Sequence, residues 1–210
     1  MVTKKFIWFF LLPLLMAVKT AGVRLIELNE PYRKVLFWFF SFPNARTSLN
    51  ELSSCLKISK TTARKASEKL ISEGFLIKEI HAKTWIIQAN QRHRYNFSEK
   101  VSFNLAMVYK AYYEQIRKKI QDIVPNPQAV MLFGSYRKGD DNEKSDIDLA
   151  VEIQEDKELK IINLCTLGSL GYRKNVLVNL HIFSRSAVNI NLFSNIANGI
   201  LLDGFLEARP

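Results

Sequence analysis

Phe133-Gly134-Ser135 is followed, after ten intervening residues, by Asp146-Ile147-Asp148. The apolar residues 129–133 predict a buried strand, so the Gly-Ser pair lies where that strand ends. Backbone amides exposed at such a turn can face an anion. The turn is therefore a candidate phosphate site.

The second segment is typical of a strand that carries two acids. Side chains alternate along a strand, so Asp146 and Asp148 project from one face while Ile147 and Leu149 point into the core. Two carboxylates held this close repel each other unless a proton or a cation lies between them. A hard divalent ion, with Mg²⁺ as the first choice, suits a site that faces a triphosphate. Each half of the pattern alone is commonplace, but together they indicate nucleotidyl or phosphoryl transfer.

These two segments resemble the signature of the minimal nucleotidyltransferases of the DNA polymerase beta superfamily, which is Gly-Ser, ten residues and Asp-x-Asp. The resemblance covers about residues 125–208. It implies that Gly134 and Ser135 hold a nucleoside triphosphate and that Asp146 and Asp148 bind Mg²⁺ as catalytic residues. Arg137 also suits the small basic turn that follows Gly-Ser in this family, so it joins the nucleotide-binding set.

The third carboxylate of the family is expected on a later strand, here residues 176–183. Asn179 stands at that position. An asparagine carbonyl can ligate a metal, but it brings no charge and cannot take a proton from an acceptor hydroxyl. His181, two residues on and on the same strand face, is a candidate substitute base, although a strand histidine is more often a simple hydrogen-bonding residue. This departure from the family pattern therefore affects turnover more than nucleotide binding.

Charge is distributed unevenly along the 210 residues, of which 48% are hydrophobic. Residues 31–96 carry twelve Lys and Arg against four acids, a net of +8, whereas residues 125–208 carry eight against eleven, a net of −3. A basic front half joined to a slightly acidic half predicts two small domains, the first of which meets a polyanion such as nucleic acid.

The basic region has the periodicity of three helices and a hairpin. Apolar residues predict a helix at 32–40, and Ser48 with Glu51 forms a capping-box signature for a second helix at 49–56. Ser59 caps a third helix at 60–73, whose inner stripe is Ala63, Ala66 and Leu70. Strands at 75–80 and 84–87 complete a pattern that resembles a winged helix-turn-helix domain.

That resemblance implies double-stranded DNA as a partner, with the third helix in the major groove and the hairpin on the backbone. The polar side of the third helix and the hairpin tip supply the contact candidates, which are Lys60, Thr61, Thr62, Arg64, Lys65 and Lys83. The alternative is a basic helical adaptor that packs only on the second domain or on a protein partner.

The fold class predicted for the whole chain is α+β. A winged helix-turn-helix domain at 24–96 precedes a small polymerase-beta-like domain at 97–210, a mixed sheet with helices on one side. The second domain begins with one amphipathic helix at 98–124. We expect this helix to pack on the sheet of that domain; the alternative is that it forms a homodimer or partner surface. Further helices are expected at 157–170 and at 190–202.

Residues 1–22 form an apolar extension with a basic head, as in a secretory signal. They lack a small-x-small cleavage pattern, and the apolar run 6–18 is short for a membrane span of about 20 residues. We expect the natural start to be Met16 or Val23, with a membrane tether as the alternative.

The combined prediction is a Mg²⁺-dependent enzyme that transfers AMP from ATP to a hydroxyl of a protein or small molecule. An attached DNA-binding domain would suit an antitoxin that modifies a toxin-like protein acceptor. The alternative is a catalytically impaired, nucleotide-sensing transcriptional regulator. Cys55 and Cys165 lie in separate predicted domains, which fits a reducing cytoplasm.

Overall fold

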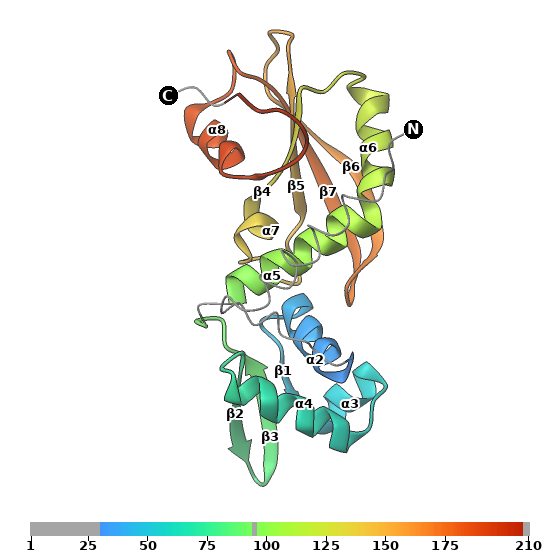
Figure 1. Cartoon of the computed structure of the whole chain (residues 1–210), viewed down its shortest axis with the longest axis vertical. Helices are drawn as coiled ribbons and strands as arrows, with labels where there is room; N and C mark the ends of the chain where they lie inside the picture. The colour runs from blue at the N-terminus through green and yellow to red at the C-terminus, as the bar shows by residue number, and fades with distance from the viewer. Residues whose placement is uncertain (1–29, 94–95, 208–210) are drawn as a thin grey trace, which may run out of the picture. The chain divides into compact units, whose positions relative to one another are not determined.

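The computed structural model describes residues 30–93 and 96–207 (Figure 1). The expectations for residues 1–22, including a start at Met16 or Val23, lie outside that description. The described residues from Pro31 onward form one compact unit that contains two sheets. No helix among them is long and apolar enough to cross a membrane.

Residues 30–93 fold into three helices and a small sheet. In chain order these are α2 (Glu30–Ser41), β1 (Arg46–Ser48), α3 (Leu49–Leu56), α4 (Lys60–Ser72), β2 (Leu76–His81) and β3 (Thr84–Ala89). The strands are antiparallel in the order β1-β3-β2. The short strand β1 was not predicted, because only its pairing with β3 distinguishes it from a loop.

Local capping residues determine where α3 and α4 begin. Ser48 and Glu51 form the predicted capping box at α3, and the Ser59 side chain accepts a hydrogen bond from the Thr62 amide at α4. Such caps satisfy amide groups that have no partner within the helix. The predicted inner stripe of α4 is confirmed, since Ala63, Ala66 and Leu70 are buried.

The expected single α-helix at 98–124 is a helical segment of three parts. They are α5 (Asn96–Leu105), the π-helix η1 (Ala106–Tyr112) and α6 (Tyr113–Ile123). The wider turn of a π-helix inserts a residue into the repeat. Val108 and Tyr113, five residues apart, are therefore both buried, whereas Tyr112, which follows Val108 at the α-helical spacing of four, is only half-buried.

The second sheet has five strands in the order β6-β7-β5-β4-β8. Its elements are β4 (Ala129–Phe133), α7 (Gly134–Lys138), β5 (Ile147–Ile153), β6 (Lys160–Leu170), β7 (Arg173–Ser184), α8 (Ile190–Ala197) and β8 (Ile200–Gly204). Strands β5 and β7 are parallel and the other neighbours are antiparallel, so the sheet is mixed as expected.

Two of the predicted helices are wrong in whole or in part. Residues 160–170 form the edge strand β6, which pairs with β7 in a hairpin whose turn is Gly171 and Tyr172. The helix expected at 190–202 ends at Ala197, and β8 follows. At the junction a Cβ on Gly199 would lie 2.7 Å from the carbonyl oxygen of Leu132, so this glycine allows the chain to turn back close to β4.

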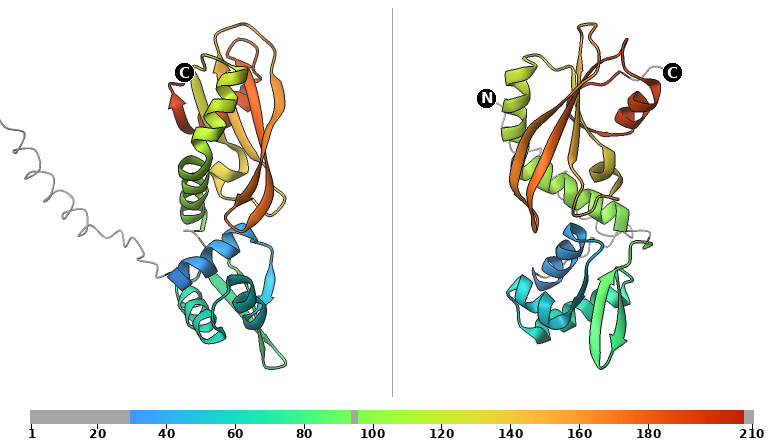
Figure 2. Two further views of the ribbon diagram at one scale, coloured as in Figure 1. Left: turned by 90° about the vertical axis from the view of Figure 1, so that its right-hand side faces the viewer. Right: turned by 180° about the vertical axis from the view of Figure 1, so that it is seen from behind.

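Helices cover both faces of the five-stranded sheet, which corrects the prediction of helices on one side. Val130, Leu132 and Leu149 pack in one cluster with residues of η1 and α6, whereas Met131, Phe133 and Ala150 pack with α8. The views in Figures 1 and 2 agree, with α6 and α8 on opposite sides of the sheet. Every residue of β4 is apolar and buried, and successive side chains of a strand point to opposite faces, so each face of the sheet needs its own cover.

Candidate functional site

The Gly-Ser turn lies directly against the second acid of the Asp-x-Asp segment. Phe133 and Asp148 are paired across β4 and β5. Gly134 has a φ of +71°, and a Cβ built on it would lie 2.5 Å from Oδ2 of Asp148. Only a residue without a side chain leaves room for this approach and adopts the left-handed conformation readily. The turn and the carboxylate therefore form a single site.

The two carboxylates share one face of the sheet with the two side chains predicted on β7. Nδ2 of Asn179 donates to Oδ2 of Asp146 at 3.3 Å, and Nε2 of His181 lies 3.4 Å from Oδ1 of Asp148. Asp148 and Asn179 are direct neighbours on the parallel strands β5 and β7. The face thus gathers four polar side chains from two adjacent strands.

His181 is held by more than its contact with Asp148. Its ring meets the ring of Phe133 edge to face, with centroids 4.9 Å apart. Its Nδ1 is buried and has no hydrogen-bond partner among the described residues. His181 is only 13% exposed and Asp148 29% exposed, so this pair is partly shielded from water. A fixed imidazole beside a carboxylate is an arrangement that can accept and pass on a proton.

The donor set fits a hard cation only in part. No group of three or more His, Cys, Asp or Glu side chains among the described residues forms a metal cage. Mg²⁺, however, is usually held by one or two carboxylates together with substrate phosphates and water. Asp146 and Asp148 supply such a pair, beside the turn at Gly134. They would hold the ion, and Asn179 brings no third charge.

The other predicted nucleotide-binding residues lie on the short helix α7. Ser135 is half-buried beside Gly134, and its carbonyl accepts the amide of Gly139, which caps α7 with a φ of +78°. Arg137 is exposed, and its Nε donates to the carbonyl of Asn198 at 2.5 Å. Arg137 therefore connects α7 to the end of α8.

A buried polar network that the sequence did not indicate holds the loop between α7 and β5. Lys100 and Asp141 are 5% and 3% exposed, and Nζ of Lys100 lies 3.4 Å from Oδ2 of Asp141. Asn104 donates to Oδ1 of Asp141 at 2.7 Å and to the carbonyl of Tyr136 at 3.1 Å. Burial lowers the pKa of Lys100 and raises the pKa of Asp141, and the ion pair offsets part of both effects.

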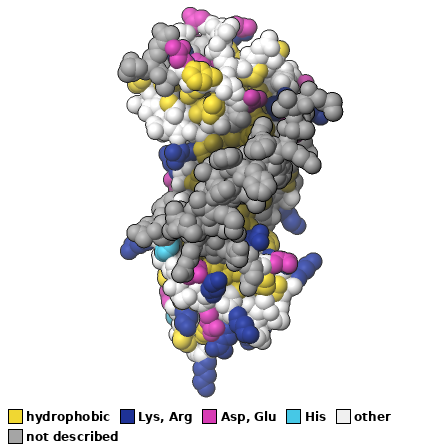
Figure 3. All heavy atoms as spheres, viewed as in Figure 1, with side chains coloured by type: hydrophobic (Ala, Val, Ile, Leu, Met, Phe, Trp, Pro, Cys, Tyr) yellow, Lys and Arg dark blue, Asp and Glu magenta, His cyan; other side chains and the backbone are white. Residues whose placement is uncertain are grey.

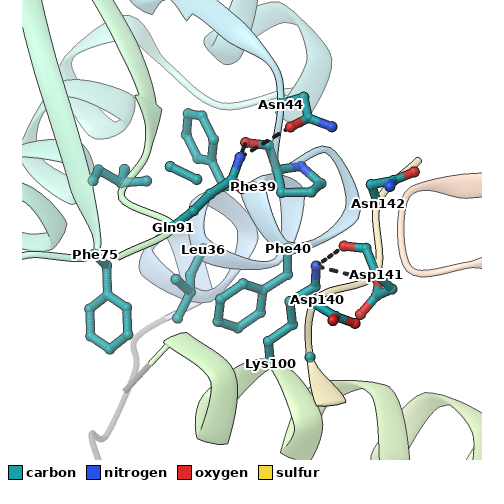
Figure 4. A pocket seen from close by; sticks show the side chains of 14 residues that line it. Leu36, Phe39, Phe40, Asn44, Phe75, Gln91, Lys100, Asp140, Asp141 and Asn142 are labelled. Carbon is teal, nitrogen blue, oxygen red and sulfur yellow. Dashed lines mark hydrogen bonds and ion pairs between the residues drawn. The ribbon is translucent and has the colours of Figure 1, made fainter. Parts of the chain in front are cut away.

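The same network forms one wall of a cavity of about 160 Å³ (Figure 4). Phe39, Phe40 and Phe75 contribute apolar surface to it, and the Lys100 side chain points to Asp141 across one end. None of the residues predicted for nucleotide or metal binding lines this cavity. It therefore lies beside the loop and is distinct from the carboxylate site.

The apolar repeat of residues 98–124 does not identify Lys100 and Asn104 as buried residues. They are four residues apart on α5 and face inward with Phe103, while the apolar neighbours Val101 and Leu105 are only half-buried. Polar residues of an amphipathic helix are expected on its solvent side, and the neighbouring sequence does not indicate that these two residues are buried. Their role depends on Asp141, which is far away in the sequence.

Three of the residues predicted to contact DNA meet in one cleft. Lys60, Arg64 and Lys83 line it together with Trp85. The Arg64 guanidinium lies 5.0 Å from the Trp85 ring centroid and also pairs with Glu68 at 2.9 Å. Thr61 and Lys65 are exposed on α4, whereas the Thr62 hydroxyl contacts the cap Ser59 at 2.7 Å. Figure 3 shows Lys and Arg side chains gathered over these elements, at the bottom of that view.

The fold and the site together define an α+β domain whose mixed sheet presents a Gly-Ser turn and two carboxylates on one face. A family model described as "Polymerase beta, Nucleotidyltransferase" matches residues 114–202, which contain all of these groups. The match supports the polymerase beta superfamily for this region and indicates nucleotidyl transfer as the general class of activity. No curated protein and no solved structure matches the chain.

Proposed function

We propose that this protein is a Mg²⁺-dependent nucleotidyltransferase that transfers a nucleoside monophosphate, AMP from ATP in the first instance, to an acceptor hydroxyl. The observation that supports this most strongly is the contact between the Gly134 turn and the Asp148 carboxylate, with Asp146 on the same face. Phosphate oxygens bound at the turn would lie beside both acids. The family match gives the same class of reaction.

In this proposal the residues mainly position the reactants. The backbone at Gly134 can approach the phosphates closely, and Ser135 adds a hydroxyl donor beside it. Mg²⁺ bound by Asp146 and Asp148 would neutralise charge on the phosphate oxygens. The acceptor oxygen forms a bond to the α-phosphorus, the bond to the leaving pyrophosphate breaks, and the hydroxyl proton passes to a base or to water.

His181 is the residue best placed to act as that base. Its Nε2 lies 3.4 Å from the Asp148 carboxylate, on the face that carries both acids. Asn179 cannot serve, because an amide has no useful basicity, and it instead donates to Asp146. The expected enzyme is therefore slow, since one of the usual acids of the family is missing.

The test is transfer of label from α-labelled ATP. Purified protein is incubated with Mg²⁺ and either small polyol acceptors or a lysate fraction, and labelled products are resolved. We expect transfer in the wild type and a loss of roughly 10²–10³-fold or more in the double variant Asp146→Asn, Asp148→Asn, as for removal of groups that stabilise developing charge. The control is Asp122→Asn, an exposed acid on α6. Equal transfer by wild type and double variant would refute the proposed site.

A second function is favoured by the basic cleft of Lys60, Arg64 and Lys83. The α2-to-β3 region has the element order of a winged helix, and we propose that it binds double-stranded DNA with α4 in the major groove. If transfer is absent while Mg²⁺-dependent ATP binding remains, the protein is better described as a nucleotide-sensing regulator, and Asn179 favours that outcome.

DNA binding is tested by a salt series on random-sequence duplex. Each lost phosphate contact should make the slope of log affinity against log salt less steep by about 0.9. We expect the triple variant Lys60→Gln, Arg64→Gln, Lys83→Gln to lose up to three such steps. The matched control replaces three exposed lysines of the second region, Lys110→Gln, Lys118→Gln, Lys119→Gln. A flat salt response in the wild type would remove the basis for this function.

A further inference from the structure

Arg173 is a buried arginine at the first position of β7. Only 7% of Arg173 is exposed. No Asp or Glu in the described part of the chain forms a direct ion pair with it, although Asp141 interacts with its charge from a greater distance. A guanidinium removed from water needs oxygen partners elsewhere.

The partners of Arg173 are the two residues that border the ends of the motif. Nη2 donates to the carbonyl of Ser145 at 2.5 Å, and Nη1 donates to the hydroxyl of Tyr136. Ser145 immediately precedes Asp146, and Tyr136 immediately follows Ser135. One side chain therefore connects the end of the Gly-Ser turn with the start of the Asp-x-Asp strand.

The Tyr136 side of this bridge is itself rigid. Its ring is buried, and its carbonyl accepts a hydrogen bond from Asn104. Burial raises the pKa of the Tyr136 hydroxyl, so this group stays neutral and can accept from Arg173. Asp146 lies one residue before β5 begins, where the sheet ladder does not yet hold the backbone. Ser145 is held locally by hydrogen bonds with Asn142, and the bond from Arg173 to its carbonyl adds a restraint from β7.

We propose that Arg173 is a positioning residue that sets the distance of Asp146 from the Gly134-Ser135 turn, and thereby the ability of the site to take Mg²⁺ with the nucleotide. This inference rests on the proposed function. Arginine is suited to the role because its planar fork reaches two oxygens at once, whereas lysine offers a single point of contact. Arg173→Lys should keep part of the function that Arg173→Met loses.

The experiment measures ATP binding by the full chain over a Mg²⁺ series. In Arg173→Met the Mg²⁺ concentration for half-maximal binding should rise roughly tenfold or more, the effect typical of losing a group that orients a metal ligand. Arg173→Lys and Tyr136→Phe should show smaller rises, and ATP binding without Mg²⁺ should be unchanged. Lys174→Met, at the exposed neighbouring position, is the matched control.

Equal weakening of ATP binding with and without Mg²⁺ would show a general structural role and overturn the inference, as would a wild-type Mg²⁺ dependence in a folded Arg173→Met. If Arg173→Met does not fold, Tyr136→Phe decides the question by the same two readings. If the wild type binds no ATP, the proposed function fails, and amide hydrogen exchange then decides. Faster exchange at residues 140–147 in Arg173→Met than in Lys174→Met supports the positioning role, and equal exchange overturns it.

Discussion

The two faces of the five-stranded sheet are built from the same strands yet have opposite compositions. One face carries Val130, Leu132, Leu149 and Val151 and is closed by η1 and α6. The other carries a smaller apolar cluster under α8 and, at one end, the four polar side chains of the candidate site. The first face stabilises the domain. Because of this, the second face can hold two carboxylates that repel each other and a histidine nitrogen without a hydrogen-bond partner among the described residues.

We call the face under η1 and α6 the closed face, and the polar end of the other face, beyond the cluster under α8, the open face. Substitutions on the closed face should change stability, and substitutions on the open face should change binding. The adjacent residues Asp148 and Leu149 provide the most direct test, because they point to opposite faces of β5.

The largest expected effect is that of Leu149→Ala. Leu149 is fully buried, so its truncation should lower the free energy of unfolding by about 2–5 kcal/mol. Chemical denaturation measures this, and ATP affinity per folded molecule should stay unchanged. Leu177→Ala, at a side chain 39% exposed on β7, should lose far less. Similar losses at both positions would contradict the assignment of the closed face.

Asp148→Asn should show the reverse. Its carboxylate is partly exposed and its only described ionic contact is His181, so the free energy of unfolding should change by less than about 1 kcal/mol. Mg²⁺-dependent ATP binding should fall by roughly 100-fold, since a direct ligand matters at least as much as the groups that orient it. Titration calorimetry measures the binding, and Asp122→Asn should leave it unchanged. Intact binding in Asp148→Asn would remove the open face from the site.

Gly134→Ala tests whether the turn belongs to the open face. A methyl group there would meet Asp148 and would hold an alanine at a φ of +71°, which costs about 1–2 kcal/mol. We expect that loss of stability together with weaker ATP binding. Gly168→Ala is the control, because a Cβ there has no atom within 4 Å and the φ is ordinary. If the two variants behave alike, the close approach at Gly134 has no functional consequence.

The smallest effect is expected for Asn179→Asp. A third acid beside Asp146 should weaken the fold slightly without Mg²⁺, through repulsion, and strengthen Mg²⁺ binding severalfold. Thermal unfolding with and without Mg²⁺ should therefore show a larger metal-dependent rise in Tm than in the wild type. Asn50→Asp, exposed on α3, should not show it. An unchanged or smaller rise would mean that position 179 does not face the metal.

Much of the site was predictable from sequence because its signals are local. The apolar run of β4, the glycine at its end and the alternation along β5 each follow from a few neighbouring residues. Asn179 was identified by its position on a strand, and β7 does align it with Asp148. The caps at Ser48 and Ser59 are equally local.

Strand β6 was mistaken for a helix because its buried residues do not alternate. Leu167 and Leu170 are buried three residues apart, which is a helical spacing, and a bulge between Asn163 and Cys165 shifts the register. The strand is stabilised by its pairing with β7, and the pattern of apolar residues within β6 does not indicate that pairing.

The sequence alone determined the turn, the acid pair and their separation, since these depend on spacing within short segments. Tertiary structure alone decided which polar residues became buried supports. In the sequence, Arg173 beside a hairpin turn and Lys100 on a helix have the features of surface residues. In the folded protein, oxygens of Ser145 and Asp141, which are distant in sequence, lie close enough to bind them. A hydrogen bond between residues remote in sequence exists only once the fold has brought them together, because loop closure must come before the contact.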